Sequence, residues 1–571
     1  MGFIGVGEWL GRRAELTPDR VGLVDEATGA RLTYRALDLR ARALAALLAG
    51  QYGIAPGDRV AILAANAPEY LDAFFAVALL GAILVPLNWR LTVTELATIL
   101  NDCAPRLLLY DAGQAERAAQ AAARVGGAPA GVTAANGAGA PAPLAARGGW
   151  RLWGRSRRIA SGATSASALA RATVNGARRV SHDVPALDAT PLPPRLVALD
   201  AFPGPDAELA ARAVAFTTSD GEEPALILYT SGTTGTPKGA LLSHRMLTWN
   251  AINTQVSWGL CESDSTPTFA PFFHAGGLNV LTTPLYHCGG TVVLVRSSEP
   301  AAVLRTIAAE RCTIVFAVPT VFQALLDHPD FAATDLSSVR FCVAGGSACP
   351  VPVIEGYARR GLVFRQGYGL TEVGVNCFSL APEDALRKAG SVGRPVFHSR
   401  ARVVDEQDRA VEVDTVGELA LAGPHVCSGY WRQPAATAEA WHDGWWHTGD
   451  LVRRDADGYY FIVGRKKDLY ISGGENIYPA EIEALLATHP AIAEAAVIAE
   501  PDTKWGEVGV AVVVPRTPGG LTAADVLAYC DGKLARYKLP RRVVFVAALP
   551  RNAMGKVVKA ELRALTDRIR S

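Results

Sequence analysis

The fold of this chain is decided by a stretch rich in glycine, threonine and serine, which reads YTSGTTGTPKG from Tyr229 to Gly239. The apolar run at residues 225–229 predicts a strand before it, and residues 244–253 predict a helix after it. Glycines allow a tight turn and a close approach to a ligand, while hydroxyls, N–H groups and a lysine suit a polyphosphate. The candidate phosphate-binding residues are Thr230, Ser231, Gly232, Thr233, Thr234, Gly235 and Lys238.

This loop is not a Walker motif, because Gly-Lys-Ser/Thr is absent and Pro237 precedes the lysine. An ordinary polar turn is the competing interpretation. A turn seldom needs so many hydroxyls and glycines together, so we favour phosphate binding.

A second motif, QGYGLTE, occupies residues 366–372 and follows another apolar run. Tyr368 offers a flat face for adenine, and Gly367 and Gly369 are expected to let it approach. Thr371 can donate a hydrogen bond to a phosphate. Glu372 can hold Mg²⁺, because that cation prefers oxygen ligands.

These two motifs, in this order, resemble those of the acyl-adenylate-forming enzymes. That superfamily includes the acyl-CoA synthetases, the adenylation domains of peptide synthetases and firefly luciferase. The resemblance covers nearly the whole chain except residues 126–194. It implies an acyl-CoA synthetase-like α/β fold, with a large N-terminal domain of layered α/β subdomains plus a β-rich subdomain, and a small mobile α+β C-terminal domain.

Two further loops resemble the adenine and ribose motifs of this superfamily. The first reads AGGSA over residues 344–348, with Gly346 and Ser347 as its candidate nucleotide contacts, although alone it would be only a turn. The second, WWHTGD over residues 445–450, ends in Asp450, which corresponds to the aspartate that binds the ribose hydroxyls. A carboxylate that accepts hydrogen bonds from both hydroxyls of a diol suits this role.

The C-terminal motifs resemble the parts of the superfamily that move between two half-reactions. In the motif GRKKD, Arg465 is expected to reach the ribose and Lys467 to take up the hinge rotation. Gly473 and Gly474 match glycines that line the channel for the thiol of coenzyme A. Lys556 matches the lysine that enters the site for adenylation. Without the flanking motifs, each of these would be an ordinary surface residue.

Residues 271–277, PFFHAGG, resemble the acyl-site motif, in which His274 borders the path of the carboxylate and the thiol. An isolated histidine is usually structural, so a direct role for His274, as an aid to thiol deprotonation or as a gate, stays open beside a structural one. The catalytic residues predicted in this way are Lys556, Glu372, Thr230 and His274. Mg²⁺ is expected on Glu372 and, more weakly, on Thr230.

The length and patterning of the chain predict at least two domains, because 571 residues exceed what one core supports. Strand and helix patterns alternate at 60–64, 69–81 and 82–86, which indicates a mainly parallel sheet. We expect an AMP-binding N-terminal domain over residues 1–464 and a C-terminal lid over residues 465–571. Residues 126–194 are rich in Ala, Gly, Ser and Arg, and their composition predicts a flexible surface insert.

The resemblance implies an AMP-forming acyl-CoA synthetase that uses ATP, Mg²⁺, a carboxylic acid and coenzyme A. Residues 269–273 and 276–281 look like those of enzymes for hydrophobic acids, which favours a medium- to long-chain fatty acid. Aryl and alicyclic acids use much the same scaffold and stay open as substrates. Less favoured functions are those of an acyl-AMP ligase that loads a carrier protein, a luciferase-like oxygenase and a non-catalytic AMP-binding protein.

Composition and net charge limit the kinds of partner and site to expect. The formal net charge of +1 gives no reason to expect nucleic acid or an anionic membrane. The nine cysteines contain no Cys-x-x-Cys pair, so neither a disulfide framework nor a zinc–cysteine site is expected. The chain carries no recognisable signal peptide and no long apolar run, which predicts a soluble, cytoplasmic protein. A homodimer is compatible with the sequence.

Overall fold

The computed structural model describes most of the chain. The described residues are 2–126, 192–202, 206–213, 215–216, 218, 220–230, 237–347, 349–472, 475–551 and 557–570. Apart from its two ends, the predicted insert at residues 126–194 lies outside them, so the flexible surface insert stays a prediction.

The motif at Tyr229–Gly239 belongs to a six-stranded sheet with the strand order β6-β5-β3-β4-β7-β8. Neighbouring strands are parallel, except that β7 and β8 are antiparallel. The predicted runs at 60–64 and 82–86 correspond to β3 and β4, and the predicted α/β fold is confirmed. The strands are β3 (Arg59–Leu63), β4 (Ile83–Pro86), β5 (Leu107–Tyr110), β6 (Arg195–Ala198), β7 (Pro224–Thr230) and β8 (Lys238–Ser243).

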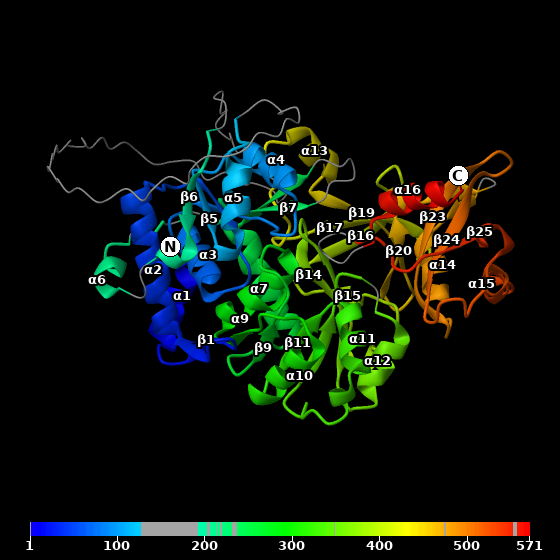
Figure 1. The fold of residues 1–571 in the computed structure, drawn as a ribbon, viewed down its shortest axis with the longest axis horizontal. Coiled ribbons are helices and arrows are strands. Elements are labelled where there is room, and N and C mark those ends of the chain that lie inside the picture. Colours follow the sequence, from blue (N-terminus) through cyan, green and yellow to red (C-terminus); the bar gives the residue numbers. More distant parts are fainter. Residues whose placement is uncertain are drawn as a thin grey trace, which may run out of the picture. The chain divides into compact units, whose positions relative to one another are not determined.

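Helices cover both faces of this sheet (Figure 1). Helix α3 leads from β3 to β4, whereas α4 leads from β4 back past β3 to β5. Right-handed crossovers that run in opposite directions place their helices on opposite faces of a parallel sheet. The strands are therefore buried on both sides, which is why they read as continuous apolar runs. The helices are α1 (Trp9–Leu16), α2 (Tyr34–Tyr52), α3 (Pro68–Leu79), α4 (Val93–Cys103) and α5 (Ala115–Ala122).

Two more sheets follow, a four-stranded sheet in the order β2-β1-β10-β9 and a five-stranded sheet in the order β11-β12-β13-β14-β15. Their strands are β1 (Val21–Asp25), β2 (Ala30–Thr33), β9 (Ser265–Thr268), β10 (Thr291–Leu294), β11 (Ile314–Ala317), β12 (Phe341–Ala344), β13 (Phe364–Leu370), β14 (Gly374–Ser379) and β15 (Arg394–Pro395). The main helices of this part are α7 (His244–Trp258), α9 (Thr283–Cys288), α10 (Pro300–Ala309), α11 (Pro319–Asp327) and α12 (Val351–Ala358).

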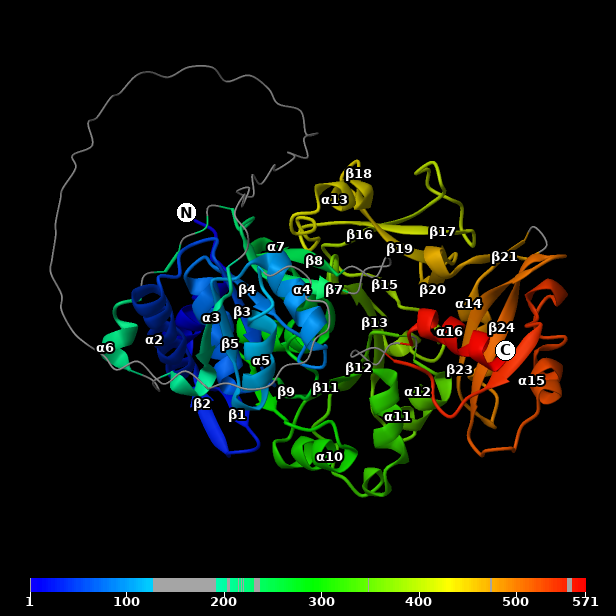
Figure 2. The same ribbon diagram turned by 45° about the horizontal axis from the view of Figure 1, so that its top comes forward.

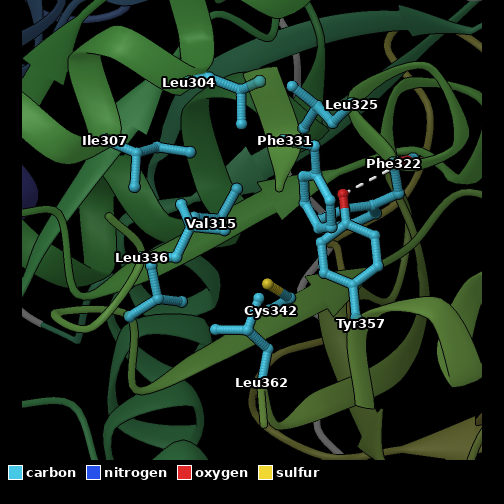
Figure 3. Close-up of a pocket in the computed structure, with 11 residues that line it drawn as sticks. Leu304, Ile307, Val315, Phe322, Leu325, Phe331, Leu336, Cys342, Tyr357 and Leu362 are labelled. Atoms are coloured by element: carbon cyan, nitrogen blue, oxygen red, sulfur yellow. Dashed lines mark hydrogen bonds between the residues drawn. The ribbon is translucent and has the colours of Figure 1, made fainter. Parts of the chain in front are cut away.

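A dense apolar core lies between α10, α11, α12 and the strands β11 to β13 (Figure 3). Its side chains enclose a void of only about 10 Å³, roughly the space of one water molecule. The Tyr357 hydroxyl donates a hydrogen bond to the carbonyl oxygen of Phe322 over 3.0 Å, so its polar atom is satisfied within the core. This void is a packing feature, because it is too small for a substrate.

The remaining strands form two β-rich units. One is the sheet β16-β17-β19-β18, to which β20 adds beside β19, and the other is the sheet β22-β21-β24-β23, to which β25 adds beside β24. Figure 2 shows the second sheet with its helices α14, α15 and α16. Residues 470–562 supply its two apolar cores. The elements are β16 (Arg400–Val404), β17 (Val416–Ala422), α13 (Pro434–Ala440), β18 (Trp441–His442), β19 (Trp445–Arg454), β20 (Tyr460–Arg465), β21 (Tyr470–Ser472), β22 (Glu475–Ile477), α14 (Pro479–Leu486), β23 (Ile492–Asp502), β24 (Gly506–Pro515), α15 (Ala523–Cys530), β25 (Arg542–Phe545) and α16 (Lys559–Arg570).

One strand was not anticipated. The sequence places the motif at 229–239 between a strand and a helix and assigns no strand after it, but β8 follows and pairs with β7, so the motif joins the two strands of a hairpin. The helix α7 then begins at His244, where the sequence predicts it. Among the described residues, no helix is both long and apolar enough to span a membrane.

Candidate active site

The hairpin β7–β8 places two site candidates opposite each other. Thr230 and Lys238 are paired residues in its register. The Thr230 hydroxyl lies 3.4 Å from the Lys238 carbonyl oxygen and 3.5 Å from Oε1 of Glu372. Residues from distant parts of the chain, the first and second nucleotide motifs, therefore meet at the end of β7.

A tyrosine that the sequence did not single out completes this cluster. The Tyr430 hydroxyl donates a hydrogen bond to Oε1 of Glu372 over 3.1 Å. Nζ of Lys238 lies 5.1 Å from the centroid of the Tyr430 ring, within the range of a cation–π contact. Burial and the nearby Glu372 carboxylate raise the pKa of Tyr430, which keeps its hydroxyl protonated as a donor.

Backbone pairing explains why Tyr430 reaches this place. The segment around it runs along β8: Leu241 N donates to Gly429 O over 2.9 Å, and Trp431 N donates to Gly239 O over 2.7 Å. Cys427 N donates to the Glu372 carbonyl oxygen over 2.8 Å. The only local signal is the pair of adjacent aromatic residues after Gly429, which carries no motif in the sequence.

Glu372, Thr230 and Tyr430 together present oxygen atoms to one point beside Lys238. A carboxylate and a hydroxyl are ligands that Mg²⁺ prefers, so Glu372 and Thr230 fit the predicted magnesium site. The combination of such a site with an ammonium group is suited to a polyphosphate, since both neutralise negative charge.

A second cluster surrounds Asp450, which is 2% exposed. The Tyr368 hydroxyl donates to its Oδ2 over 2.5 Å, and Nε of Arg465 lies 2.5 Å from its Oδ1. Asp450 and Arg465 face each other in the register of β19 and β20. Burial and the Asp450 carboxylate raise the pKa of Tyr368 above its ordinary value, so it too acts as a donor. The three candidates for adenine and ribose binding thus meet.

The glycines of the second motif differ in what they do. A Cβ on Gly369 would lie 2.3 Å from the Gly374 carbonyl oxygen, so this glycine is required by the hairpin of β13 and β14. The sequence assigns Gly369 to the approach of adenine, and the structure adds this backbone reason. A Cβ on Gly367 would meet nothing closer than 3.6 Å. Thr371 lies in the turn of the same hairpin.

The hinge candidate follows directly on β20. Lys467 is exposed within the short helical turn Lys466–Asp468, next to Arg465. Nζ of Lys466 lies 3.1 Å from Oε2 of Glu418, and Gly449 N donates to Oε1 of Glu418 over 3.0 Å. Burial opposes ionisation of Glu418, but His447, Lys466 and the Gly449 amide outweigh it and lower its pKa to about 2.

The acyl-site motif forms a tight turn around His274. Nδ1 of this residue accepts a hydrogen bond from Gly276 N over 3.0 Å, so the neutral ring carries its proton on Nε2. A Cβ on Gly276 would lie 3.8 Å from the ring of Phe316, and a Cβ on Gly345 would lie 3.2 Å from the same ring. The turn and the glycine loop after β12 therefore both face Phe316.

Phe316 was not predicted from the sequence. It is a half-buried residue of β11, whose neighbour Val315 is buried in the core of Figure 3. Alternate residues of a strand point to opposite faces, so Phe316 faces away from that core, toward His274 and Gly345. Gly346, which follows Gly345 in the chain, adopts φ +85°, and Ser347 is exposed.

Several predicted site residues lie outside the part of the chain that the structure describes. They are Ser231, Gly232, Thr233, Thr234, Gly235, Gly473, Gly474 and Lys556. The two ends of the candidate phosphate loop, Thr230 and Lys238, are described, and Thr230 lies 3.5 Å from Oε1 of Glu372.

Comparisons with known proteins identify the family of this chain. Residues 10–431 match the model of the AMP-binding enzyme family, and residues 481–556 match the AMP-binding enzyme C-terminal domain. The chain is 37% identical to a feruloyl-CoA synthase from Amycolatopsis sp over 98% of both chains. It is 38% identical to an indoleacetate–CoA ligase from Aromatoleum aromaticum over 99% of this chain and 98% of the relative.

Two more similarities bear on the site. A long-chain-fatty-acid–CoA ligase from Mycobacterium tuberculosis is 33% identical over 98% of both chains. The structure of the o-succinylbenzoate coenzyme A synthetase from Bacillus subtilis, in complex with ATP and magnesium ion, matches with a TM-score of 0.77 and 28% identity. It covers 97% of this chain and 99% of that chain. The chain belongs to the AMP-binding enzyme family, within the acyl-adenylate-forming superfamily.

Proposed function

We propose that this enzyme joins an aromatic carboxylic acid to coenzyme A through an acyl-adenylate. The proposal of an aromatic substrate rests on Phe316, a half-buried aromatic ring that packs against Gly345 and lies near Gly276 of the His274 turn. Relatives at 37% and 38% identity are named for feruloyl and indoleacetate substrates, both of which are aromatic acids. An aromatic acid therefore takes the place of a fatty acid as the first choice.

The proposed first half-reaction is attack of the substrate carboxylate on the α-phosphorus of ATP, with release of pyrophosphate. Lys238 and the loop that begins at Thr230 bind the phosphates, while Asp450 and Arg465 hold the ribose and Tyr368 borders adenine. Bound at Glu372 and Thr230, Mg²⁺ supplies positive charge against the phosphate oxygens. Holding the reactants in line and neutralising charge are the main contributions an enzyme makes to this chemistry.

In the proposed second half-reaction the thiol of coenzyme A loses its proton to solvent, and its sulfur attacks the acyl carbonyl carbon. The thioester C–S bond forms, the C–O bond to the phosphate of AMP breaks, and AMP leaves. His274 stands on the acyl side, where Gly276 holds Nδ1 and so keeps the proton of the neutral ring on Nε2. We assign rotation about Lys467 to the change between halves, with Lys556 serving adenylation and Gly473–Gly474 the thiol channel.

A straight-chain fatty acid is the second candidate, because a relative at 33% identity is named a long-chain-fatty-acid–CoA ligase. The apolar residues that favoured it in the sequence carry less weight now. Residues 278–282 form a helical turn in which every residue is buried, so they fill the core. They are therefore poor indicators of chain length.

A panel of acids separates the two candidates. Release of AMP is measured with and without coenzyme A for ferulate, indoleacetate, benzoate, butyrate and decanoate. We expect the highest kcat/KM for one of the aromatic acids, and AMP release that depends on coenzyme A. A rise from butyrate to decanoate that exceeds every aromatic acid would favour the fatty-acid candidate. Acyl-AMP formation without any thioester would favour a carrier protein as acceptor.

A further inference from the structure

Three side chains of the β-rich sheet converge away from the nucleotide and acyl sites. Asp408 lies in the turn between β16 and β17, His442 ends β18, and His447 lies in β19. One potential ligand atom from each residue lies within 4.8 Å of the other two. The centroids of the two imidazole rings are 4.4 Å apart. In the part of the chain that the structure describes, this is the group of His, Cys, Asp and Glu side chains that meets the spacing of a metal site.

The separations within this group match a tetrahedral cation site. Nε2 of His447 lies 3.4 Å from Oδ1 of Asp408, and Nδ1 of His442 lies 3.0 Å from Oδ2 of the same carboxylate. Zinc binds nitrogen and oxygen at about 2.0–2.1 Å, so two ligands at tetrahedral angles are roughly 3.3 Å apart. A cation therefore fits between these atoms with small movements of the side chains.

The burial of His447 is an independent observation that points to a ligand. Its side chain is 7% exposed, and its Nε2 is buried without a hydrogen-bond partner although it faces Asp408. A buried polar atom without a partner is costly, so its position needs an explanation. Asp408 adopts a left-handed backbone conformation, with φ +59°, in the turn between β16 and β17.

The second ring nitrogen of His447 has a neighbour that is typical of metal-binding histidines. Its Nδ1 lies 3.4 Å from Oε2 of Glu418, which in turn is held by Lys466 and the Gly449 amide. In metal sites, the ring nitrogen that does not bind the metal commonly faces a carboxylate, which sets the tautomer and the ring orientation. Glu418 is thus a positioning residue for His447.

We propose that Asp408, His442 and His447 bind zinc or another late first-row divalent cation. Two imidazoles and one carboxylate suit such a cation, whereas Mg²⁺ prefers oxygen ligands. The cation joins the β16–β17 turn to β18 and β19. Through His447 and Glu418 it also braces Lys466, beside the hinge candidate, and the strand that carries Asp450 three residues later. This site is independent of which acid the enzyme activates.

The test uses the full-length protein after treatment with a chelator. Zn²⁺ is titrated in competition with a chromophoric chelator, and Co²⁺ is titrated while its visible absorption is recorded. We expect one zinc ion per chain and a cobalt spectrum of a site with nitrogen and oxygen ligands. Asp408→Asn and His442→Asn are expected to weaken zinc binding at least tenfold. These side chains are 41% and 42% exposed, so both variants should fold, which circular dichroism checks.

His328→Asn is the matched control, because His328 also faces an aspartate, Asp330, at 3.8 Å but has no second histidine in that pair. It should leave zinc affinity unchanged. Equal affinity in the wild type and in both Asp408→Asn and His442→Asn would overturn the proposal. So would a cobalt spectrum dominated by thiolate charge transfer, which would place the cation on cysteines, or a dissociation constant above about 1 mM.

Discussion

The proposed nucleotide side and the proposed acyl side of the site are built in different ways. On the nucleotide side, direct hydrogen bonds and an ion pair hold Glu372, Tyr430, Asp450, Tyr368 and Arg465. On the acyl side, the ring of Phe316 packs against Gly345 and lies near Gly276, so the contacts there are apolar and depend on shape.

This difference indicates which residues should determine specificity for the acid substrate. Charged hydrogen bonds depend strongly on residue type and geometry, so the nucleotide side tolerates few changes. Apolar contacts depend on shape and volume, and changes of one side chain shift them gradually. We therefore expect substitutions on the nucleotide side to affect all acids alike, and substitutions on the acyl side to affect acids unequally.

The largest effect is expected for Glu372→Gln. The amide keeps an acceptor for the Tyr430 hydroxyl but removes the negative charge that suits Mg²⁺. Removing one preorganised electrostatic group at a transition state costs on the order of 10²–10³ in rate, so adenylation should fall by that factor for every acid. Pyrophosphate exchange over a range of Mg²⁺ concentrations measures it. A loss confined to one class of acid would contradict the proposed division of the site.

Phe316→Ala tests the acyl side, where we expect the loss of activity to depend on the acid. Losing the contact area of a large aromatic side chain costs about 1–3 kcal/mol, so kcat/KM for aromatic acids should fall roughly 10- to 100-fold. The KM for ATP should not change. Phe316→Leu serves as the control, since it keeps apolar volume and should spare decanoate more than ferulate. Equal losses for both acids would exclude Phe316 as a specificity residue.

Lowering the pH should reduce the free energy of unfolding through His425, which lies close to Glu372. His425 is buried beside the Glu372 turn, where its Nδ1 contacts the Val373 carbonyl oxygen, and burial lowers its pKa to about 4. The unfolded chain, with an ordinary histidine pKa near 6.5, binds the proton more readily. Stability from this group is therefore complete above about pH 6.5 and falls by about 2 kcal/mol between pH 7 and pH 5.

Denaturant unfolding at the two pH values measures this difference in the wild type and in His425→Gln. The remaining buried histidines titrate in both proteins, so the comparison isolates His425. The free energy of unfolding of the variant should depend less on pH, by about 2 kcal/mol. An identical pH dependence would show that His425 is not held neutral.

The smallest effect is expected for Tyr430→Phe. This change removes one hydrogen bond to Glu372 but keeps the ring against Lys238. A net hydrogen bond to a charged group contributes about 1.5–3 kcal/mol, and the retained carboxylate should limit the loss to the lower end, roughly tenfold in adenylation. The loss should again be equal for ferulate and decanoate. If the variant matched the wild type, Tyr430 would serve packing alone.

The sequence anticipated the parts of the fold that are locally encoded. Strands β3 and β4 and helix α3 begin and end within two residues of the predicted runs, because continuous apolar runs reflect burial on both faces of a parallel sheet. It failed at β8, where a short apolar segment between a glycine-rich loop and a helix reads as part of the loop. Only pairing with β7 makes that segment a strand.

The sequence by itself determined the family and the class of reaction, since the candidate phosphate loop, the Tyr-Gly-Leu-Thr-Glu motif and the Gly-Asp turn each place their functional groups within a few adjacent residues. The tertiary structure alone decided which distant residues meet: Tyr430 beside Glu372, Phe316 opposite Gly345, and Asp408 with two histidines. The physical reason is that strand pairing and close packing bring these residues together across long stretches of chain, and such contacts leave no local pattern in the sequence.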